Sequence, residues 1–173
     1  MTDVLDLIPP GQLLARPDLA EQALEGLVRA TTYRAVEAMH CRVAVADLWS
    51  DRGQRIDQLL FGEAFDVLDR RDGRAWGRAR RDGVVGWVVL DSLSTGAPLP
   101  THRVASVTAA LPLNALVGED ASGVADADLE PVGAFERDPV AVAERLLGTP
   151  HALGARSSIE TDCAGLVQQA LLA

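Results

Sequence analysis

The residues best suited to chemistry lie near the end of the printed sequence, in the run Thr161-Asp162-Cys163-Ala164-Gly165-Leu166-Val167-Gln168. The apolar positions after Cys163 predict a helix that begins at Asp162 or Cys163. A thiol in the first turn of a helix has a lowered pKa, because the positive end of the helix favours the thiolate. Such a thiolate attacks a carbonyl carbon when a histidine acts as its base. The run therefore predicts Cys163 as a nucleophile.

Histidine is scarce around this run. No histidine follows Cys163 in the sequence, and His151 stands in the segment before it. His151 is one candidate for a substitute base, but a loop histidine without an orienting partner more often faces solvent. His40 and His102 begin two β-rich segments and are predicted to be ordinary surface or edge residues.

A capped helix and a loop precede the nucleophile. Asp138-Pro139 predicts a helix start, with the aspartate as N-cap and the proline at the first helical position. The helix is expected to end at Gly148, and the loop 149–161 then leads to Cys163. We therefore treat residues 138–173 as one unit.

Short strands fill the segment 41–95. Asp72-Gly73 and Asp82-Gly83 stand between apolar runs, and this pattern is the strongest local signal for a β-hairpin. Closely spaced strands with tight turns predict a small antiparallel barrel. After a break rich in proline and serine, residues 101–135 are predicted to form a second, shortened β unit. Residues 1–40 are predicted to be an arm with a short helix, capped by Asp18, with Glu21 at the capping-box position.

The first β unit resembles the bacterial SH3-like domains that are fused to cell-wall hydrolases. The resemblance rests on three ordered elements, which are Gln58–Glu63, Asp72–Gly77 and Asp82–Val88. The segment 123–131 is similar to the end of the first unit, which favours a second SH3-like unit. The resemblance implies two small SH3-like barrels, the second one shortened.

The last unit resembles the NlpC-type papain-like cysteine endopeptidases, which cut peptide bonds in peptidoglycan stem peptides. The resemblance rests on the capped helix, the Gly-Thr-Pro loop, Arg-Ser-Ser and Asp-Cys-x-Gly-Leu-Val. It implies the first two helices of an α+β papain-like domain, and a γ-D-glutamyl-L-diamino-acid type of activity on stem-peptide fragments. It also implies that Cys163 is the nucleophile and that Asp162 holds the free amine of the substrate. His151 and Ala164 stand where the family has an active-site tyrosine and a serine, so both are candidate substrate contacts.

The departures from the family pattern bear on activity. The loop Pro150–Ala155 lacks the tyrosine, the tryptophan and one glycine of the family, and the catalytic histidine normally lies well downstream of the cysteine helix. We therefore expect residues 1–173 to be an inactive, truncated or degenerate member of this family. The alternative is a non-catalytic SH3-like module, or a pseudoenzyme, that binds cell-wall peptide fragments or a partner protein.

Composition and charge limit the partners, the location and the cofactors that we expect for this protein. The formal net charge of −9 opposes binding to nucleic acid, because the protein's field repels phosphates. No apolar run approaches the roughly 18 residues of a membrane span, and the first residues are acidic where a secretory signal is basic, so we expect a cytoplasmic protein without a membrane partner. Cys41 and Cys163 lie far apart and form no ligand cluster, so we expect neither a metal nor another cofactor.

Three further features of the sequence concern which side chains are exposed. The helix after Cys163 carries Leu166, Val167, Ala170 and Leu171, and an exposed apolar face of this kind predicts self-association unless something covers it. Trp76 and Trp87 are predicted to be barrel core rather than a ligand surface. The arginines in the run 78–81 are predicted to lie in a solvated turn.

Overall fold

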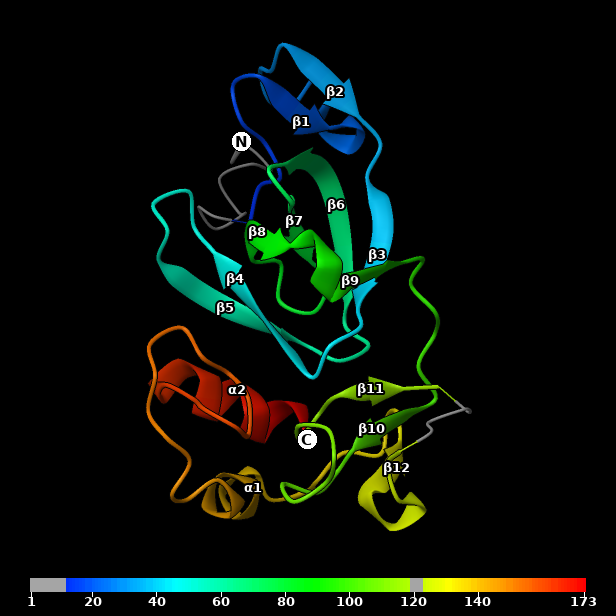
Figure 1. Ribbon diagram of the computed structural model, residues 1–173, viewed down its shortest axis with the longest axis vertical. Coiled ribbons are helices and arrows are strands. Elements are labelled where there is room, and N and C mark those ends of the chain that lie inside the picture. Colours follow the sequence, from blue (N-terminus) through cyan, green and yellow to red (C-terminus); the bar gives the residue numbers. More distant parts are fainter. Residues whose placement is uncertain (1–11, 119–122) are drawn as a thin grey trace, which may run out of the picture.

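The described residues form twelve β-strands, and two α-helices lie towards the C-terminal end (Figure 1). The computed structural model describes residues 12–118 and 123–173. Seven strands form the large sheet in the order β5-β4-β8-β7-β6-β3-β9. They are β3 (Glu37–Cys41), β4 (Val45–Trp49), β5 (Arg55–Leu60), β6 (Ala64–Arg71), β7 (Arg74–Ala79), β8 (Val85–Val89) and β9 (Leu93–Thr95), with a 3-10 turn, η3 (Leu90–Ser92), before β9. This architecture confirms the predicted class, mainly β with α.

The tightest turn of the large sheet joins β6 to β7. Asp72 and Gly73 have positive φ angles of 49° and 72°, and Arg71 pairs directly with Arg74 across the turn. Two central residues with positive φ define a type I′ turn, which Asp-Gly favours and which matches the twist of the two strands. Asp82-Gly83 lies in the connection between β7 and β8. Both predicted hairpins are present.

The core of the large sheet is built from side chains on alternate strand positions. Its fully buried members are Cys41, Leu48, Leu59, Phe65, Ala75, Ala79 and Val88. A second cluster on the opposite face joins Trp76 to Leu14 and Leu19 of the N-terminal segment. Trp76 is therefore core, as predicted, whereas Trp87 is only partly buried and lines a surface pocket.

The N-terminal segment differs from its prediction. The expected capped helix at 18–24 is instead a strand, β1 (Leu19–Glu21), followed by one 3-10 turn, η2 (Gln22–Leu24). β1 pairs in parallel with β2 (Thr32–Arg34), and Glu21 is buried with its carboxylate on Arg78 at 2.6 Å. Tertiary pairing has overridden the local helix signal. Residues 1–11 of the predicted arm lie outside the described residues.

A small sheet and the two helices form the lower half of the molecule in Figure 1. The small sheet has the order β11-β10-β12. Its elements are β10 (His102–Val104), β11 (Leu116–Val117) and β12 (Leu129–Pro131), with a 3-10 turn, η4 (Asp126–Asp128), before β12. Leu60 of β5 packs with Val104 and Ala115, so the small sheet is held against the large sheet by apolar contacts.

Helix α1 (Pro139–Arg145) packs against helix α2 (Cys163–Leu172). Their shared cluster contains Leu113, Val142, Leu146, Ala170 and Ala173, with Leu166 at its edge. Part of the α2 face that was expected to be uncovered is therefore covered by the chain itself. Val167 and Leu171 remain 56% and 66% exposed. Within the described residues, no helix is long and apolar enough to cross a bilayer.

The arginine run after β7 is not simply solvated. Arg78 and Arg80 pair with Glu21 and Asp66, and Arg81 is largely buried with its guanidinium 3.3 Å from Glu63. The prediction of a solvated turn is therefore wrong, because the fold brings Glu21 of β1, Asp66 of β6 and Glu63, which stands just before β6, against these arginines.

Candidate active site at the start of the second helix

Cys163 is the first residue of α2, and its side chain is exposed. Asp162 precedes it as the N-cap in an extended conformation, and the Asp162 Oδ1 accepts the backbone N–H of Gly165 at 2.8 Å. The cap satisfies one of the free N–H groups at the helix start. The thiol therefore stands at the N-terminal end of a ten-residue helix, next to the cap.

The second oxygen of Asp162 holds the preceding loop. Oδ2 accepts the backbone N–H of Gly154 at 2.8 Å, so one carboxylate fixes both the helix and the loop. Burial alone would raise the pKa of Asp162, but the hydrogen bonds from the N–H groups of Gly165, Gly154 and Ala164, together with nearby His151, lower it. Asp162 is therefore ionised at neutral pH and already accepts hydrogen bonds through both oxygens.

Gly165 lets the loop lie directly on the helix. A Cβ at this position would stand 2.2 Å from the carbonyl oxygen of Ala155 and 2.8 Å from the Cα of Arg156. Both atoms belong to the backbone, so neither can move away cheaply. The glycine of the Asp-Cys-x-Gly pattern is thus required by the close approach of the loop.

The loop is fastened to the large sheet as well. The Arg55 guanidinium donates from Nε to the carbonyl of Leu153 at 2.9 Å and also pairs with Glu160. Gln58 donates to Glu160 at 3.1 Å from the neighbouring part of β5. The segment that carries the thiol therefore rests on β5.

Arg156 makes the deepest of these contacts. Its side chain is 1% exposed, with Nε 2.9 Å from Asp57 Oδ1 and Nη1 3.2 Å from Glu63 Oε1. Its backbone N–H donates to the buried amide oxygen of Gln58 at 2.9 Å. Burial alone would lower the pKa of the guanidinium, but Glu63 and Asp57 raise it. Arg156 stays charged, and it ties the thiol segment to the large sheet.

The acids around Arg156 outnumber the bases. Asp57, Glu63 and Asp82 face Arg156 and Arg81, which gives three formal negative charges against two positive ones. The pKa of Asp57 is raised to about 8, chiefly by burial and also by the adjoining carboxylate of Asp82, against the lowering effect of Arg156. The Oδ2 atoms of Asp57 and Asp82 are buried without a hydrogen-bond partner among the described residues. One proton on this pair satisfies both oxygens and neutralises the cluster.

Amide side chains extend the connection to the small sheet. Gln169 of α2 is fully buried and donates to the carbonyl of Arg156 at 2.7 Å. Asn114, which is also fully buried, donates to Gln169 Oε1 at 2.9 Å. A continuous chain of hydrogen bonds therefore runs from Asn114 through Gln169 and Arg156 to Gln58 of β5.

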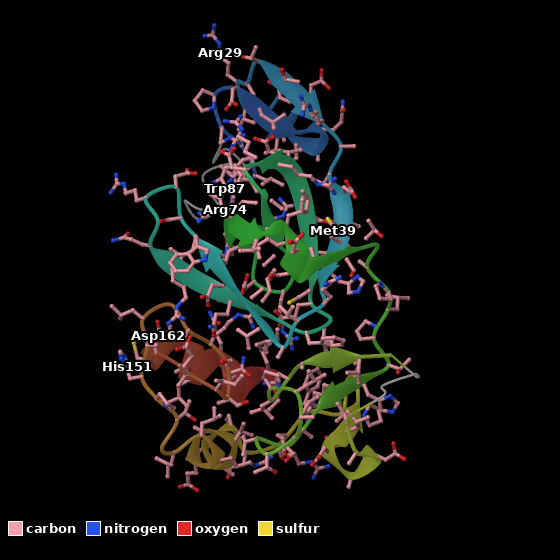
Figure 2. The ribbon with its side chains drawn as sticks, viewed as in Figure 1. Arg29, Met39, Arg74, Trp87, His151 and Asp162 are labelled. Atoms are coloured by element: carbon pink, nitrogen blue, oxygen red, sulfur yellow. The ribbon has the colours of Figure 1, made fainter. Side chains whose placement is uncertain are left out.

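The predicted site residues come together only in part. Cys163, Asp162 and Ala164 share the first turn of α2, and Cys163 and Ala164 are exposed. His151 is exposed on the loop, where its backbone bridges to Thr161, and Figure 2 shows its side chain on the same side of the molecule as Asp162. No hydrogen bond joins His151 to Cys163 in the described part of the chain.

The other residues of this region were missed from the sequence. Arg156, Asp57 and Glu63 carry no local pattern, because their partners lie about a hundred residues apart in the chain. Two of them stand within the elements that carry the resemblances, Glu63 in Gln58–Glu63 and Arg156 in Arg-Ser-Ser, but neither element shows that the two side chains meet. No three His, Cys, Asp or Glu side chains of the described residues gather in a way that holds a metal ion.

The second cysteine is a structural thiol. Cys41 is fully buried in the core of the large sheet, and its Sγ lies 3.3 Å from the carbonyl oxygen of Val43. Burial raises the pKa of Cys41 to about 11. Cys163 is thus the reactive candidate of the two.

Comparisons with known proteins agree with this arrangement. Residues 50–93 match the model of the bacterial dipeptidyl-peptidase SH3 domain. The fold is similar to that of an NlpC/P60 family protein from Bacillus cereus ATCC 10987, with a TM-score of 0.61 and 14% identity over 78% of this chain and 72% of that one. The chain therefore has an NlpC-like fold that includes an SH3-like region.

Two further solved structures are more distant. NlpC1 from Trichomonas vaginalis has a TM-score of 0.34 and 15% identity over 81% of this chain and 64% of that one. NlpC2 from the same organism has a TM-score of 0.34 and 15% identity over 80% and 66%. No curated protein matches the chain.

Proposed function

We propose that this protein is a member of the peptidoglycan-peptide cysteine endopeptidases of the γ-D-glutamyl-L-diamino-acid type, with Cys163 as the nucleophile. One observation carries the proposal: the exposed thiol begins a helix whose N-cap, Asp162, also fixes the adjoining loop. The NlpC-like fold supports the same assignment. Small stem-peptide fragments are the proposed substrates, and the cytoplasm is the proposed location.

The proposed reaction places each group in a defined role. The Cys163 thiolate attacks the carbonyl carbon of the γ-D-glutamyl bond and forms a thioester, while the diamino acid leaves as an amine that must gain a proton. Water then hydrolyses the thioester and regenerates the thiol. Asp162 is the proposed partner for the free ammonium group of the substrate, to which its ionised carboxylate is electrostatically suited. His151 is the proton carrier to be tested first.

A second candidate function is supported by one specific observation. His151 and Cys163 share no hydrogen bond in the described residues, and Ala164 offers no hydroxyl group where the resembled family has a serine. Without a base, hydrolysis of an amide loses most of its acceleration. In this alternative the site binds the peptide fragment and does not cut it.

Hydrolysis of L-Ala-γ-D-Glu-diaminopimelate by the purified protein tests both candidates. If the first candidate is right, diaminopimelate is released, and its release is lost in Cys163→Ala, reduced in His151→Ala and retained in Cys41→Ala. If the peptide is not cut, its binding is measured by calorimetry with the wild type and Asp162→Asn. Binding that Asp162→Asn weakens supports the second candidate, whereas a folded protein that neither cuts nor binds the peptide contradicts both.

Self-association remains a separate proposal. Val167 and Leu171 are the exposed apolar residues of α2, and a second copy of the chain would cover them. Sedimentation velocity of the wild type and of Val167→Glu tests this, since a concentration-dependent dimer is expected only for the wild type. A monomer at all concentrations contradicts the proposal.

A further inference from the structure

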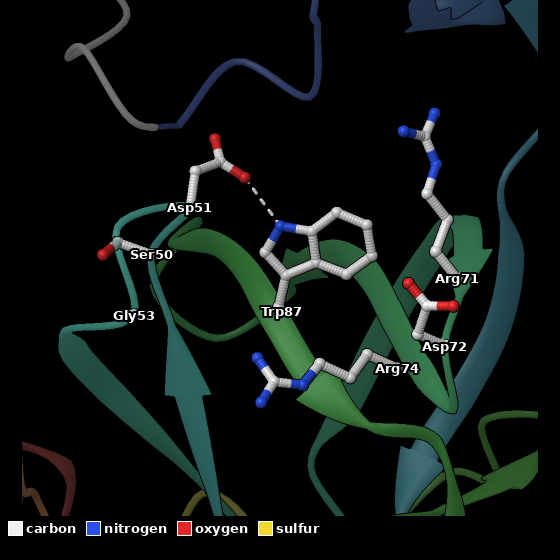
Figure 3. Close-up of a pocket in the computed structure, with 7 residues that line it drawn as sticks. All are labelled: Ser50, Asp51, Gly53, Arg71, Asp72, Arg74 and Trp87. Carbon is white, nitrogen blue, oxygen red and sulfur yellow. Dashed lines mark hydrogen bonds between the residues drawn. The ribbon is translucent and has the colours of Figure 1, made fainter.

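A surface pocket of about 550 Å³ lies on the large sheet, away from the thiol. The tip of the β4–β5 hairpin forms one wall with Asp51 and Gly53, and the β6–β7 turn forms the other with Arg71, Asp72 and Arg74. Trp87 of β8 stands between the two walls (Figure 3). The volume falls within the range of roughly 300–1,000 Å³ that small-molecule sites occupy.

Trp87 is held in place before any ligand arrives. Its Nε1 donates to Asp51 Oδ1 at 2.7 Å, and its ring centroid lies 6.5 Å from that of the buried Trp76. The indole is thus fixed at both its polar edge and its base. A fixed, partly exposed aromatic ring binds apolar groups without a large loss of side-chain entropy.

The two arginines of the pocket stand in an unfavourable arrangement. Arg71 and Arg74 are direct partners across the β6–β7 turn, and like charges at such positions destabilise a sheet. Arg71 is compensated by Asp69 at 2.9 Å and Asp18 at 3.1 Å. The side chain of Arg74 makes no hydrogen bond or ion pair with any residue in the ranges 12–118 and 123–173, although its backbone pairs within the sheet. Its guanidinium is therefore free to bind an anion, and a carboxylate fits its planar donor pair.

The acids of the pocket restrict the kind of anion. Asp51 keeps one oxygen free after its bond to Trp87, and the Asp72 side chain is exposed at the turn. With Arg71 and Arg74, the formal charges of the lining sum to zero. A polyanion would be repelled by the two carboxylates and by the net charge of −9. A ligand with both a carboxylate and an ammonium group matches the pocket.

We propose that this pocket binds a short zwitterionic peptide. Its carboxylate pairs with Arg74, its apolar part lies on Trp87, and its ammonium group faces Asp51 on the opposite wall. The site is separate from the proposed active site, since Figure 2 shows Trp87 and Arg74 lying well apart from His151 and Asp162. The proposal does not rest on the proposed function, because no residue of the thiol segment lines the pocket.

Titration followed by NMR of the indole N–H of Trp87 tests the proposal, with the signal assigned through Trp87→Phe. The first arm uses L-Ala-γ-D-Glu-diaminopimelate, the second uses the ordinary peptide Ala-Glu-Lys, and the third uses Ala-Glu-Lys amide. The protein carries Cys163→Ala, so that the peptide stays intact. We expect a saturable shift of the indole signal in the first two arms. A shift in the first arm alone identifies wall fragments as the source, and a shift in both identifies peptide carboxylates in general.

Two variants distinguish binding in the pocket from nonspecific electrostatic attraction of the peptide. Arg74→Gln is expected to weaken binding about 10-fold or more, because a hydrogen bond between charged groups is lost. The amide arm is expected to weaken the binding of Ala-Glu-Lys similarly. Arg52→Gln removes an exposed arginine of the same β4–β5 hairpin that does not line the pocket, and it is expected to change nothing. Equal losses in Arg52→Gln and Arg74→Gln overturn the proposal.

Absence of any shift at Trp87 with millimolar peptide also overturns it. If signals around Asp162 shift while that of Trp87 does not, the pocket proposal fails and the proposed function stands. If the signal of Trp87 shifts and the signals around Asp162 do not, the pocket proposal stands and the proposed function fails.

Discussion

The guanidinium of Arg156 lies 2.9 Å from the carboxylate of Asp57, and the two residues belong to segments that are distant in sequence. Arg156 stands in the loop before Cys163, and Asp57 lies on β5 of the large sheet. Both side chains are buried, so the loop cannot leave the sheet without breaking a desolvated hydrogen bond from the guanidinium.

Replacement of Arg156 is expected to destabilise the fold strongly. Arg156→Met leaves Asp57 buried without its guanidinium partner and leaves Glu63 with Arg81 alone. Loss of one partner of a buried ion pair costs about 3–5 kcal/mol. Urea unfolding at pH 7 measures the change. Arg29→Met, at an exposed arginine, serves as control and is expected to stay within about 0.5 kcal/mol of the wild type. A loss of similar size in both variants would show that the buried pairs are not the cause.

Asp57 is expected to make the fold less stable as the pH rises. Its pKa is about 8 in the folded protein, against 3.8 for an ordinary aspartate, so the folded state holds the proton more tightly. The associated stability is complete below pH 4 and is lost as the pH rises towards 8. Asp57→Asn keeps an acceptor for Arg156 and carries no titrating proton. The free energy of unfolding of the variant, relative to that of the wild type, should therefore increase between pH 5 and 8. Asp91→Asn, at an exposed position, should follow the wild type throughout.

Asp162 is expected to have the opposite pH dependence. Its lowered pKa means that its stabilising effect is present above the ordinary aspartate pKa of about 4 and is lost as the pH falls through its folded value. Asp162→Ala is expected to cost about 0.5–2 kcal/mol at pH 7 as a lost helix cap. Asp138→Ala is the matched variant, because it removes the N-cap of α1. The Asp138 side chain accepts hydrogen bonds from the backbone N–H groups of Val140 and Ala141, both within its own helix.

The two cap variants should differ at the thiol. Only Asp162→Ala frees the Gly154 loop, so only that variant is expected to change the rate at which iodoacetamide alkylates Cys163. Equal rates in both variants would mean that Asp162 acts as an ordinary helix cap and does not position the thiol.

Gly165→Ala is expected to destabilise the protein although alanine is the better helix former. The added Cβ would meet the Ala155 carbonyl at 2.2 Å, so the loop must shift or the helix must move. Overpacking of this kind costs about 1–3 kcal/mol, more than the roughly 1 kcal/mol gained in helix propensity. Gly118→Ala is the control, because its Cβ would meet nothing within 4 Å. Thermal unfolding measures both, and a Gly165→Ala protein at least as stable as the wild type would contradict the close packing.

The two cysteines are expected to react with iodoacetamide in a fixed order. Cys163 is exposed at a helix start, whereas Cys41 is buried with a pKa of about 11. At pH 8, mass spectrometry of the native protein should find the label on Cys163 alone, and on both residues in 8 M urea. Early labelling of Cys41 would contradict the described core.

Local sequence patterns predicted several turns and helices correctly. They did not predict the ion pairs between residues that are far apart in the sequence. The Asp72-Gly73 turn, the Asp138 cap and the helix from Cys163 each depend on residues a few positions apart, so the sequence displays their cause. Arg156 and Glu63 meet only because the loop folds back onto the large sheet. A different pairing, of β1 with β2, together with the ion pair of Glu21 and Arg78, made the predicted helix at 18–24 a strand.

The chain of buried amides through Asn114, Gln169 and Arg156 bears on how such proteins are recombined. The large sheet and the segment that carries Cys163 are therefore not independent units joined by a passive linker. Here the two parts share one polar interior, so a foreign SH3-like region would have to supply equivalents of Gln58 and Asp57 to be accepted. Gene fusions that exchange this region should therefore fail at folding, before binding or catalysis is reached.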